Sequence, residues 1–217
     1  MTVPTKRTVS FCTNAEEGLA PFCRVPTVGY NSVASPNADA NMQYDAIIVG
    51  DSYAGLSAGV QLARARREVC IICSGQPGNG SVKRVVSDFP NHHEIGVIDS
   101  TLSELGRYPS LRTIDGIAVE ARREGTGGFR VTLHSGESRV ASKLLLAFAE
   151  NNSTLARQLG CVIENGAFGW LIRTDPGMMT TVPGVYATGN DGRCTSGTNS
   201  AVADGILAGI SIHTALL

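Results

Sequence analysis

Six cysteines and a pair of adjacent histidines are the side chains of this sequence that could do redox or metal chemistry. Cys70 and Cys73 have the C-x-x-C spacing of a redox pair. They lie in an apolar run that predicts a strand, where residues three apart point to opposite faces about 10 Å apart, whereas a disulfide needs Cα atoms within about 7 Å. We therefore interpret both as small buried hydrophobic residues.

His92 and His93, followed by Glu94, are interpreted as loop residues because adjacent side chains diverge and no second cluster completes a ligand set.

A glycine-rich turn indicates a different chemistry, the binding of a dinucleotide. The turn reads Gly50-Asp51-Ser52-Tyr53-Ala54-Gly55 and stands between a predicted strand and a predicted helix. A helix N-terminus offers N–H groups and the positive end of its dipole to a pyrophosphate. In this interpretation Gly50 makes the tight turn, and Gly55 lets the helix and the strand pack closely.

Three residues depart from the usual pattern of such a site. Ser52 takes the place of the middle glycine, so its side chain limits the approach of a ligand but can donate a hydrogen bond. Asp51 adds an unfavourable negative charge near the expected phosphates. Cys73 stands where an acid usually binds a ribose hydroxyl, so either a neighbour such as Ser74 holds the ribose or adenosine binding is weakened. The alternative interpretation is a tight βα turn with no ligand.

The elements that must position this turn form one βαβ unit. Order begins at Tyr44, and the β-branched run 46–49 predicts a strand buried on both faces. Apolar residues at helical spacing follow over 56–63 and end in a basic stretch that suits a helix C-terminus. The run 69–73 predicts a second strand, and a loop over 74–80 closes the unit at the expected length of about 30 residues.

The rest of the chain predicts a small antiparallel meander and several further elements. The expected meander strands are 111–124, 129–133 and 140–146, and the other expected elements are helices over 98–105, 155–159 and 200–217 and a strand over 184–189 that runs into a turn. These elements predict an α/β fold, a doubly wound parallel sheet of the Rossmann type with an antiparallel β-meander.

The composition excludes several classes of protein. Of the 217 residues, 42% are hydrophobic and 17% charged, which excludes a fully disordered chain. The net charge of −1 gives no general attraction to nucleic acid or to a membrane surface, and no apolar run of 18 residues predicts a membrane span. The scattered cysteines favour a reducing, cytoplasmic setting.

Residues 1–43 hold four of the nine prolines and no periodic pattern, and we expect them to form a disordered N-terminal extension.

Several stretches resemble thioredoxin-reductase-like flavoproteins, FAD-dependent members of the pyridine nucleotide-disulfide oxidoreductases. The stretch 44–56 is similar to the FAD-binding start of that family, in the branch that favours a GGSYAGLSA-type turn. The loop 74–79 is similar to an SGxPRN loop of that branch, with Gly78 in place of the usual arginine. The stretch 174–190 is the more specific match and resembles the family's second FAD segment, T(D)P…T(S/T)VPGVYAAGD.

This resemblance implies an FAD-binding domain over residues 44–217, made of two FAD segments at about 44–149 and 150–217. The family inserts an NADPH-binding domain between these segments, with its own glycine fingerprint. Here no second strand–glycine turn–helix is found, and the chain passes directly into the second segment. The acid that binds the flavin ribityl chain in the family is Asn190 here, which hydrogen-bonds a hydroxyl less strongly than a carboxylate does.

The resemblance also implies FAD as the cofactor and a set of contact residues. The expected contacts are Gly50, Ser52, Tyr53, Ala54 and Gly55 at the pyrophosphate, Ser74 and Asn79 along the nucleotide, Gly189 and Asn190 at the ribityl–phosphate region, Ala201 at the helix N-terminus that faces the flavin, and Ala118 in the strand that passes the adenine. No catalytic side chain and no metal site are predicted. Cys194 is the one thiol that could lie near the flavin, and we expect a small structural role for it.

Three hypotheses about function follow. The chain is a flavoprotein oxidoreductase that takes electrons from a small-molecule substrate or a redox partner protein. Alternatively, it is a non-catalytic FAD-binding or interaction module, or a truncated gene product with little cofactor. We expect a homodimer to be one of its assemblies. Because a second dinucleotide site and a redox-spaced cysteine pair are missing from the pattern, we expect the isolated chain not to reduce thioredoxin with NADPH.

Overall fold

The structure is a computed structural model, and it describes residues 42–73, 105–125, 127–147, 153–166, 169–188 and 198–217. Every structural statement below concerns these residues. The expected N-terminal extension lies outside them except for Met42 and Gln43. The expected loop over 74–80 and all but the last residue of the expected helix over 98–105 lie outside them too.

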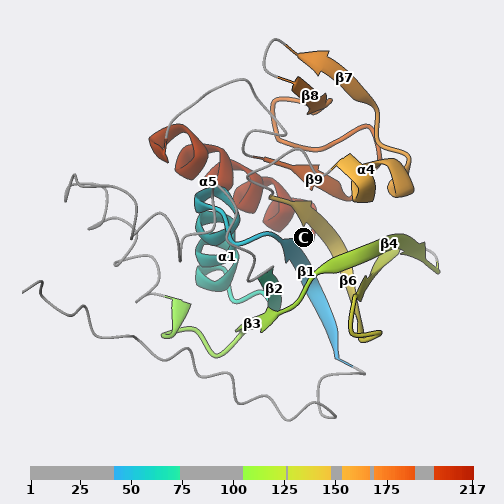
Figure 1. The fold of residues 1–217 in the computed structure, drawn as a ribbon. Coiled ribbons are helices and arrows are strands. Elements are labelled where there is room, and N and C mark those ends of the chain that lie inside the picture. The colour runs from blue at the N-terminus through green and yellow to red at the C-terminus, as the bar shows by residue number, and fades with distance from the viewer. Residues whose placement is uncertain (1–41, 74–104, 126, 148–152, 167–168, 189–197) are drawn as a thin grey trace, which may run out of the picture. The chain divides into compact units, whose positions relative to one another are not determined.

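A seven-stranded mixed sheet forms the centre of the described fold (Figure 1). Its strands are β1 (Gln43–Val49), β2 (Val69–Cys73), β3 (Leu111–Asp115), β4 (Ala118–Glu124), β5 (Gly128–Leu133), β6 (Ser138–Leu146) and β9 (Val185–Ala187). Their order is β3-β2-β1-β6-β5-β4, with β9 also paired to β6. The pairs β3–β2, β2–β1, β1–β6 and β6–β9 are parallel, and β4–β5 and β5–β6 are antiparallel. This confirms the predicted α/β fold class.

The predicted βαβ unit is present with nearly the expected bounds. β1 begins at Gln43, one residue before the expected start, and leads into helix α1 (Tyr53–Arg64) and then β2. The core residues of β1, among them Ile47 and Ile48, are fully buried because the sheet is covered on both faces. Arg64 lies in the last turn of α1, where a cation faces the negative end of the helix dipole.

The predicted single strand over 111–124 is wrong, because this stretch forms two strands with different partners. β3 pairs in parallel with β2, whereas β4 pairs antiparallel with β5. The chain turns at Gly116, where the N–H donates to the Cys73 carbonyl at 2.8 Å. A Cβ at Gly116 would lie 2.9 Å from Leu133 Cδ1, so the connection packs closely against the end of β5. The meander therefore consists of β4, β5 and β6, and it continues the central sheet.

Two helices and a hairpin complete the described elements. Helix α4 (Ser153–Leu159) and helix α5 (Thr198–Thr214) confirm the two predicted helices, with α5 starting two residues earlier and ending three residues earlier than expected. The hairpin of β7 (Ile163–Gly166) and β8 (Gly169–Ile172) forms a separate two-stranded sheet that the sequence did not predict. Its four-residue strands are too short for a clear alternation of apolar and polar residues.

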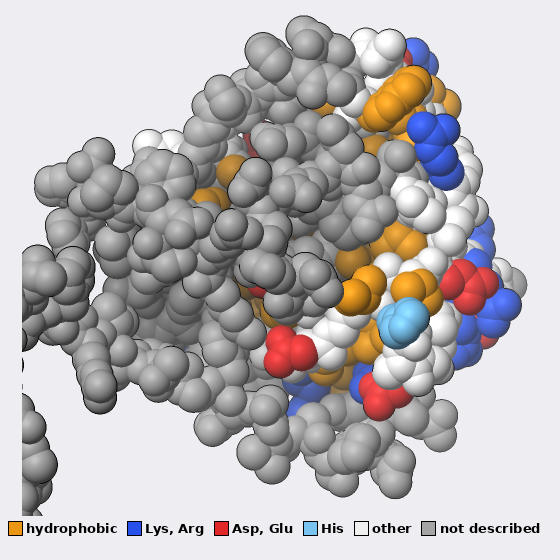
Figure 2. Space-filling view, in the orientation of Figure 1, with side chains coloured by type: hydrophobic (Ala, Val, Ile, Leu, Met, Phe, Trp, Pro, Cys, Tyr) orange, Lys and Arg blue, Asp and Glu red, His pale blue; other side chains and the backbone are white. Residues whose placement is uncertain are grey.

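The hairpin carries the single tryptophan of the chain on its surface. Half of the Trp170 surface is exposed, and the guanidinium of Arg157 lies 5.6 Å from the ring centroid. Figure 2 shows apolar side chains beside basic ones at the upper right, where Figure 1 places β7 and β8. The tryptophan therefore lies in a part of the fold away from the glycine turn.

The core forms two clusters, one on each face of the sheet. Residues of α1 and α5 contribute to one cluster, and residues of α4 and the meander contribute to the other. Cys70 belongs to the meander-side cluster and Cys73 to the helix-side cluster. This confirms the prediction that the two cysteines face opposite sides of the sheet, which excludes a redox pair between them.

Helices α1 and α5 approach each other through backbone contact. A Cβ at Gly205 would lie 2.1 Å from the Ala54 carbonyl oxygen, and one at Gly209 would lie 2.9 Å from Gln61 Cβ and 3.1 Å from Ala58 O. Gly209 lies one turn after Gly205 in α5, and its contacts Ala58 and Gln61 lie one to two turns after Ala54 in α1. The two helices therefore run in the same general direction. The amino ends of both helices consequently point to the same side, and α5 extends beyond the start of α1 (Figure 1).

We predict that Gly205→Ala destabilises the protein by about 1–3 kcal/mol, because the new methyl group meets backbone atoms that cannot move aside. In an open helix position the same change stabilises by about 0.5–1 kcal/mol, so the expected sign is opposite to that of helix propensity. Urea unfolding at constant m-value measures the difference. Gly106→Ala, with no atom within 4 Å of its new Cβ, is the control and should change stability by less than about 0.5 kcal/mol. Equal stability of the two variants would contradict the close approach.

Candidate functional site

The carboxyl ends of the parallel strands meet at one edge of the sheet. The N–H of Ala147 donates to Val49 O at 2.9 Å, which aligns the ends of β6 and β1. The N–H of Thr188 donates to Leu146 O at 3.0 Å, which aligns the ends of β9 and β6. The chain proceeds from β1 to β2 and β3 on one side, whereas β6 and β9 lie on the other. This reversal marks the crevice in which open α/β sheets bind ligands.

The glycine turn at this edge has the geometry that its sequence predicts. Gly50 has φ of 116°, a left-handed conformation that residues with side chains rarely adopt. A Cβ at Gly55 would lie 2.4 Å from Gly50 O and 3.1 Å from Ala147 Cβ. Both expected conformational roles are therefore confirmed: Gly50 makes the turn, and Gly55 allows α1 to lie against the strand end.

Ser52 has a structural role that the sequence did not predict. It is the N-cap of α1, and its hydroxyl accepts a hydrogen bond from Gly55 N at 3.2 Å. The same hydroxyl donates to Ala147 O at 2.8 Å. The one proton of this buried hydroxyl is thus donated within the protein. A ligand would therefore contact the backbone of Ser52 and not its side chain.

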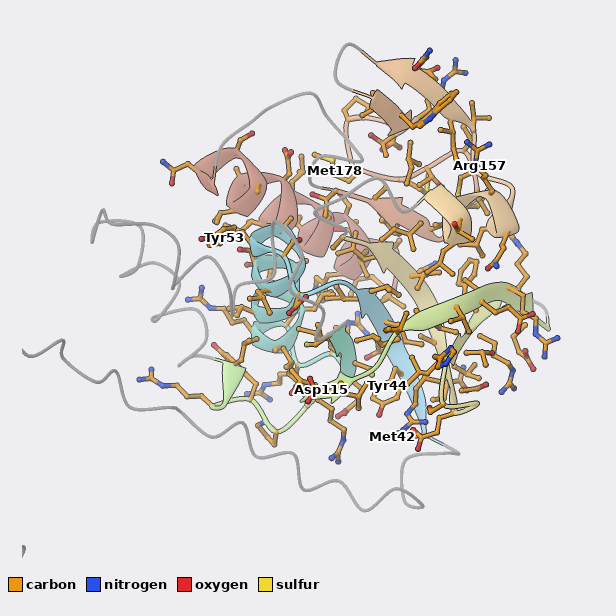
Figure 3. The ribbon with its side chains drawn as sticks, in the orientation of Figure 1. Met42, Tyr44, Tyr53, Asp115, Arg157 and Met178 are labelled. Carbon is orange, nitrogen blue, oxygen red and sulfur yellow. The ribbon has the colours of Figure 1, made fainter. Side chains whose placement is uncertain are left out.

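The amino ends of α1 and α5 converge on the crevice. Gly205 contacts Ala54 in the first turn of α1, so Ala201, one turn earlier in α5, lies on the amino-terminal side of that contact. Figure 3 shows Tyr53 at this end of α1, beside α5. Neither helix has an acidic residue in its first turn. The positive dipole ends of both helices therefore point to the same side of the fold.

The connection between β3 and β4 borders the same edge. The hydrogen bond from Gly116 N to Cys73 O places this connection at the end of β2, and Ala118, partly buried, begins β4 two residues later. In the strand register Asp115 lies directly opposite Cys73. A carboxylate therefore stands beside the position where the sequence lacks the usual ribose-binding acid; Figure 3 labels it. The sequence analysis missed Asp115 because strand register cannot be derived from the chain alone.

Thr188 is the second residue of the site that the sequence analysis missed. Its side chain is completely buried, and its hydroxyl has no hydrogen-bond partner among the described residues. It directly follows β9 and precedes Gly189, so the only available signal was a hydroxyl residue within the TGN stretch. A buried hydroxyl without a partner is costly, and at a ligand crevice it is a candidate contact.

Several predicted residues lie outside the described part of the chain. These are Ser74, Asn79, Gly189, Asn190 and Cys194. The described residues contain no group of three or more histidine, cysteine or acidic side chains that could hold a metal ion. In the same part of the chain, no helix has both the length and the apolar character needed to cross a membrane.

The Cys161 thiol, after α4, and the Tyr186 phenol, in β9, have shifted pKa values. Burial raises the pKa of the Cys161 thiol, an effect that its 3.5 Å hydrogen bond to Thr180 Oγ1 partly offsets. Burial also raises the pKa of the Tyr186 phenol, and the charge of Asp175 raises it further. Both groups therefore stay protonated in the folded protein at higher pH than in the unfolded chain.

Comparison with known proteins identifies the fold class. No family model matches the sequence, and no curated protein matches it either. Among solved structures, an oxidoreductase from Agrobacterium tumefaciens has a TM-score of 0.66 at 18% identity. The atypical thioredoxin reductase TRi from Desulfovibrio vulgaris Hildenborough and the thioredoxin reductase of T. acidophilum also have TM-scores of 0.66, at 14% and 13% identity. Each comparison covers 80% of this chain and 98% of the other.

The chain therefore has the α/β fold of thioredoxin-reductase-like oxidoreductases, as the resemblance of its motifs predicts. At these identities the comparison establishes the fold. The contacts expected for Gly50, Tyr53, Ala118 and Ala201 stay predictions, although the structure gathers all four at the carboxyl edge of the sheet.

We predict that Ser52→Ala lowers stability by about 1–2 kcal/mol, since it removes the N-cap of α1 and leaves Ala147 O without its hydroxyl donor. Chemical denaturation followed by circular dichroism measures this loss. Ser135→Ala removes an exposed hydroxyl with a single long contact of 3.4 Å and should stay within about 0.5 kcal/mol of the parent protein. An unchanged midpoint for Ser52→Ala would show that the capping bond is not formed.

We also predict that stability falls as the pH rises above about 9. The unfolded chain releases the Cys161 and Tyr186 protons near the ordinary pKa values of 9.0 and 10.0, whereas the folded state retains them. Their stabilising contribution is thus complete below these values and is lost as the pH rises toward the folded-state values. Urea midpoints at about pH 8 and about pH 10.5 should differ less in Cys161→Ala and Tyr186→Phe than in the parent protein. The same pH dependence in all three proteins would contradict the raised pKa values.

Proposed function

We propose that this chain is the FAD-binding part of an oxidoreductase of the thioredoxin-reductase-like type. The observation that carries the proposal is the convergence of the α1 and α5 amino ends on a glycine turn at the carboxyl edge of the sheet. This arrangement suits an extended ligand with a central pyrophosphate, since the positive ends of two helix dipoles face it. The second FAD-like stretch includes β9, which ends at the same edge.

The residues present fit such a cofactor. The left-handed Gly50 and the side-chain-free Gly55 let the backbone of the turn approach a phosphate closely, and the amide of Ala54 has no acceptor within its own helix. Ala201 would lie along the flavin-side half of the ligand, and Ala118 along the adenine side. When bound, FAD would supply two-electron redox chemistry, while the chain supplies binding and orientation.

Two forms of this function are distinguished by simple measurements. In the first, the flavoprotein takes electrons from a small-molecule substrate or a redox partner protein, working in the cytoplasm, alone or as a homodimer. In the second, the chain binds FAD without turnover. The burial of Cys70 and Cys73 on opposite faces favours the second form, because it removes the C-x-x-C pair as an electron acceptor. Bleaching of bound flavin by a candidate substrate would select the first form, and bound but inert flavin the second.

We predict that the purified protein binds FAD stoichiometrically, with the absorption bands of flavin, and that Gly50→Val abolishes this binding. Valine disfavours the left-handed conformation of residue 50, so the turn cannot keep its shape. Gly136→Val is the matched control, because Gly136 has φ of 88° in the turn between β5 and β6, with open space around it.

Both variants carry a similar backbone strain of about 1–3 kcal/mol, but only Gly50→Val should lose the cofactor. Reconstitution with excess FAD, followed by gel filtration and absorbance, measures the occupancy. A colourless parent protein, or equal FAD occupancy in the parent and in Gly50→Val, would overturn the proposed function.

A further inference from the structure

Thr188 is completely buried, and its hydroxyl has no hydrogen-bond partner among the described residues. Two other buried hydroxyl residues, Ser52 and Thr180, have hydrogen-bond partners within the protein. Ser52 bonds to Gly55 and Ala147, and Thr180 bonds to both the N–H and the carbonyl of Val182, at 3.1 and 3.3 Å. Leaving a buried hydroxyl unpaired is unfavourable, so Thr188 indicates a partner that comes from outside the described residues.

The position of Thr188 is defined by strand pairing. Leu146 lies opposite Ala187 in the β6–β9 register, so Ala147 and Thr188 form the next pair beyond the strands. Ala147 is also the residue whose carbonyl accepts the Ser52 hydroxyl and whose Cβ faces Gly55. Thr188 is therefore separated from the first turn of α1 by a single residue of the neighbouring strand.

The alternation along β9 decides which way the side chain points. Val185 and Ala187 belong to the meander-side cluster, whereas Tyr186 belongs to the helix-side cluster. Thr188 comes two residues after Tyr186, so its side chain points to the same side, which α1 and α5 cover. This is the side on which the two helix amino ends converge, and both favour an anionic group there.

From this placement we infer that the Thr188 hydroxyl donates a hydrogen bond to a phosphate oxygen of the bound dinucleotide. The inference rests on the proposed function for the identity of the ligand, and it adds a specific ligand contact from the second FAD-like stretch. The donor is neutral and the acceptor anionic, so the bond belongs to the stronger, charge-assisted class.

The test compares Thr188→Val, which keeps the shape and removes the hydroxyl, with Thr188→Ser, which keeps the hydroxyl. We expect Thr188→Val to leave the ligand-free urea midpoint unchanged or higher, to weaken FAD binding about tenfold, and to shrink the FAD-induced rise in Tm. Thr188→Ser should bind FAD as the parent does. Flavin fluorescence titration gives Kd, and thermal unfolding with and without FAD gives the linked stabilisation.

Thr180→Val is the matched control, since this buried threonine has partners within the protein. It should lower the ligand-free stability and leave the FAD Kd unchanged, the reverse of the Thr188→Val result. A loss of ligand-free stability in Thr188→Val would show that its hydroxyl has an internal partner and would overturn the inference. Equal FAD affinity of the parent and Thr188→Val would also overturn it, while leaving the proposed function intact.

ADP serves as a second probe that carries the phosphates without the flavin. If the parent protein takes up no FAD but is stabilised by ADP, and Thr188→Val reduces that stabilisation, the proposed flavin function fails and the phosphate contact stands. If neither FAD nor ADP stabilises the parent protein, both the proposed function and the inference are overturned.

Discussion

The first turn of α1 is held by backbone contact on three sides, and the geometry of the site depends on this constraint. Gly55 lies against Gly50 O and the end of β6, Ala54 O touches Gly205 of α5, and Ser52 ties the turn to Ala147. Neither Gly55 nor Gly205 has space for a methyl group. Interiors packed this closely do not deform gradually, so the turn has one arrangement, and the helix amino ends are positioned with it.

Strand β6 connects this turn to the remainder of the described fold. Of its nine residues, 140–146 pair with β1, 138–141 with β5 and 144–146 with β9. The meander and the second FAD-like stretch are thus attached to the same strand whose end, Ala147, accepts the Ser52 hydroxyl. A displacement of β6 would move the glycine turn and Thr188 together, so both halves of the site share one support.

The hydrogen-bond partners of three buried hydroxyls distinguish structural polar groups from a candidate ligand contact. Ser52 and Thr180 have their hydrogen bonds satisfied by nearby backbone, which is how capping and turn residues stabilise a fold. Thr188 is as buried as they are but has no such partner among the described residues. The sequence shows three ordinary hydroxyl residues, and only their surroundings distinguish the one suited to hold a ligand.

The sequence by itself determined the β1–α1–β2 unit, the left-handed turn at Gly50 and the opposed faces of Cys70 and Cys73. These depend on patterns within about 30 neighbouring residues: a buried β-branched run, a glycine where φ is positive, and alternation along a strand. Only the tertiary structure decided that 111–124 divides between two partners, that Asp115 stands opposite Cys73, and that Thr188 is buried without a partner. Each of these is a relation between segments far apart in the chain, and local propensity carries no information about which segments meet.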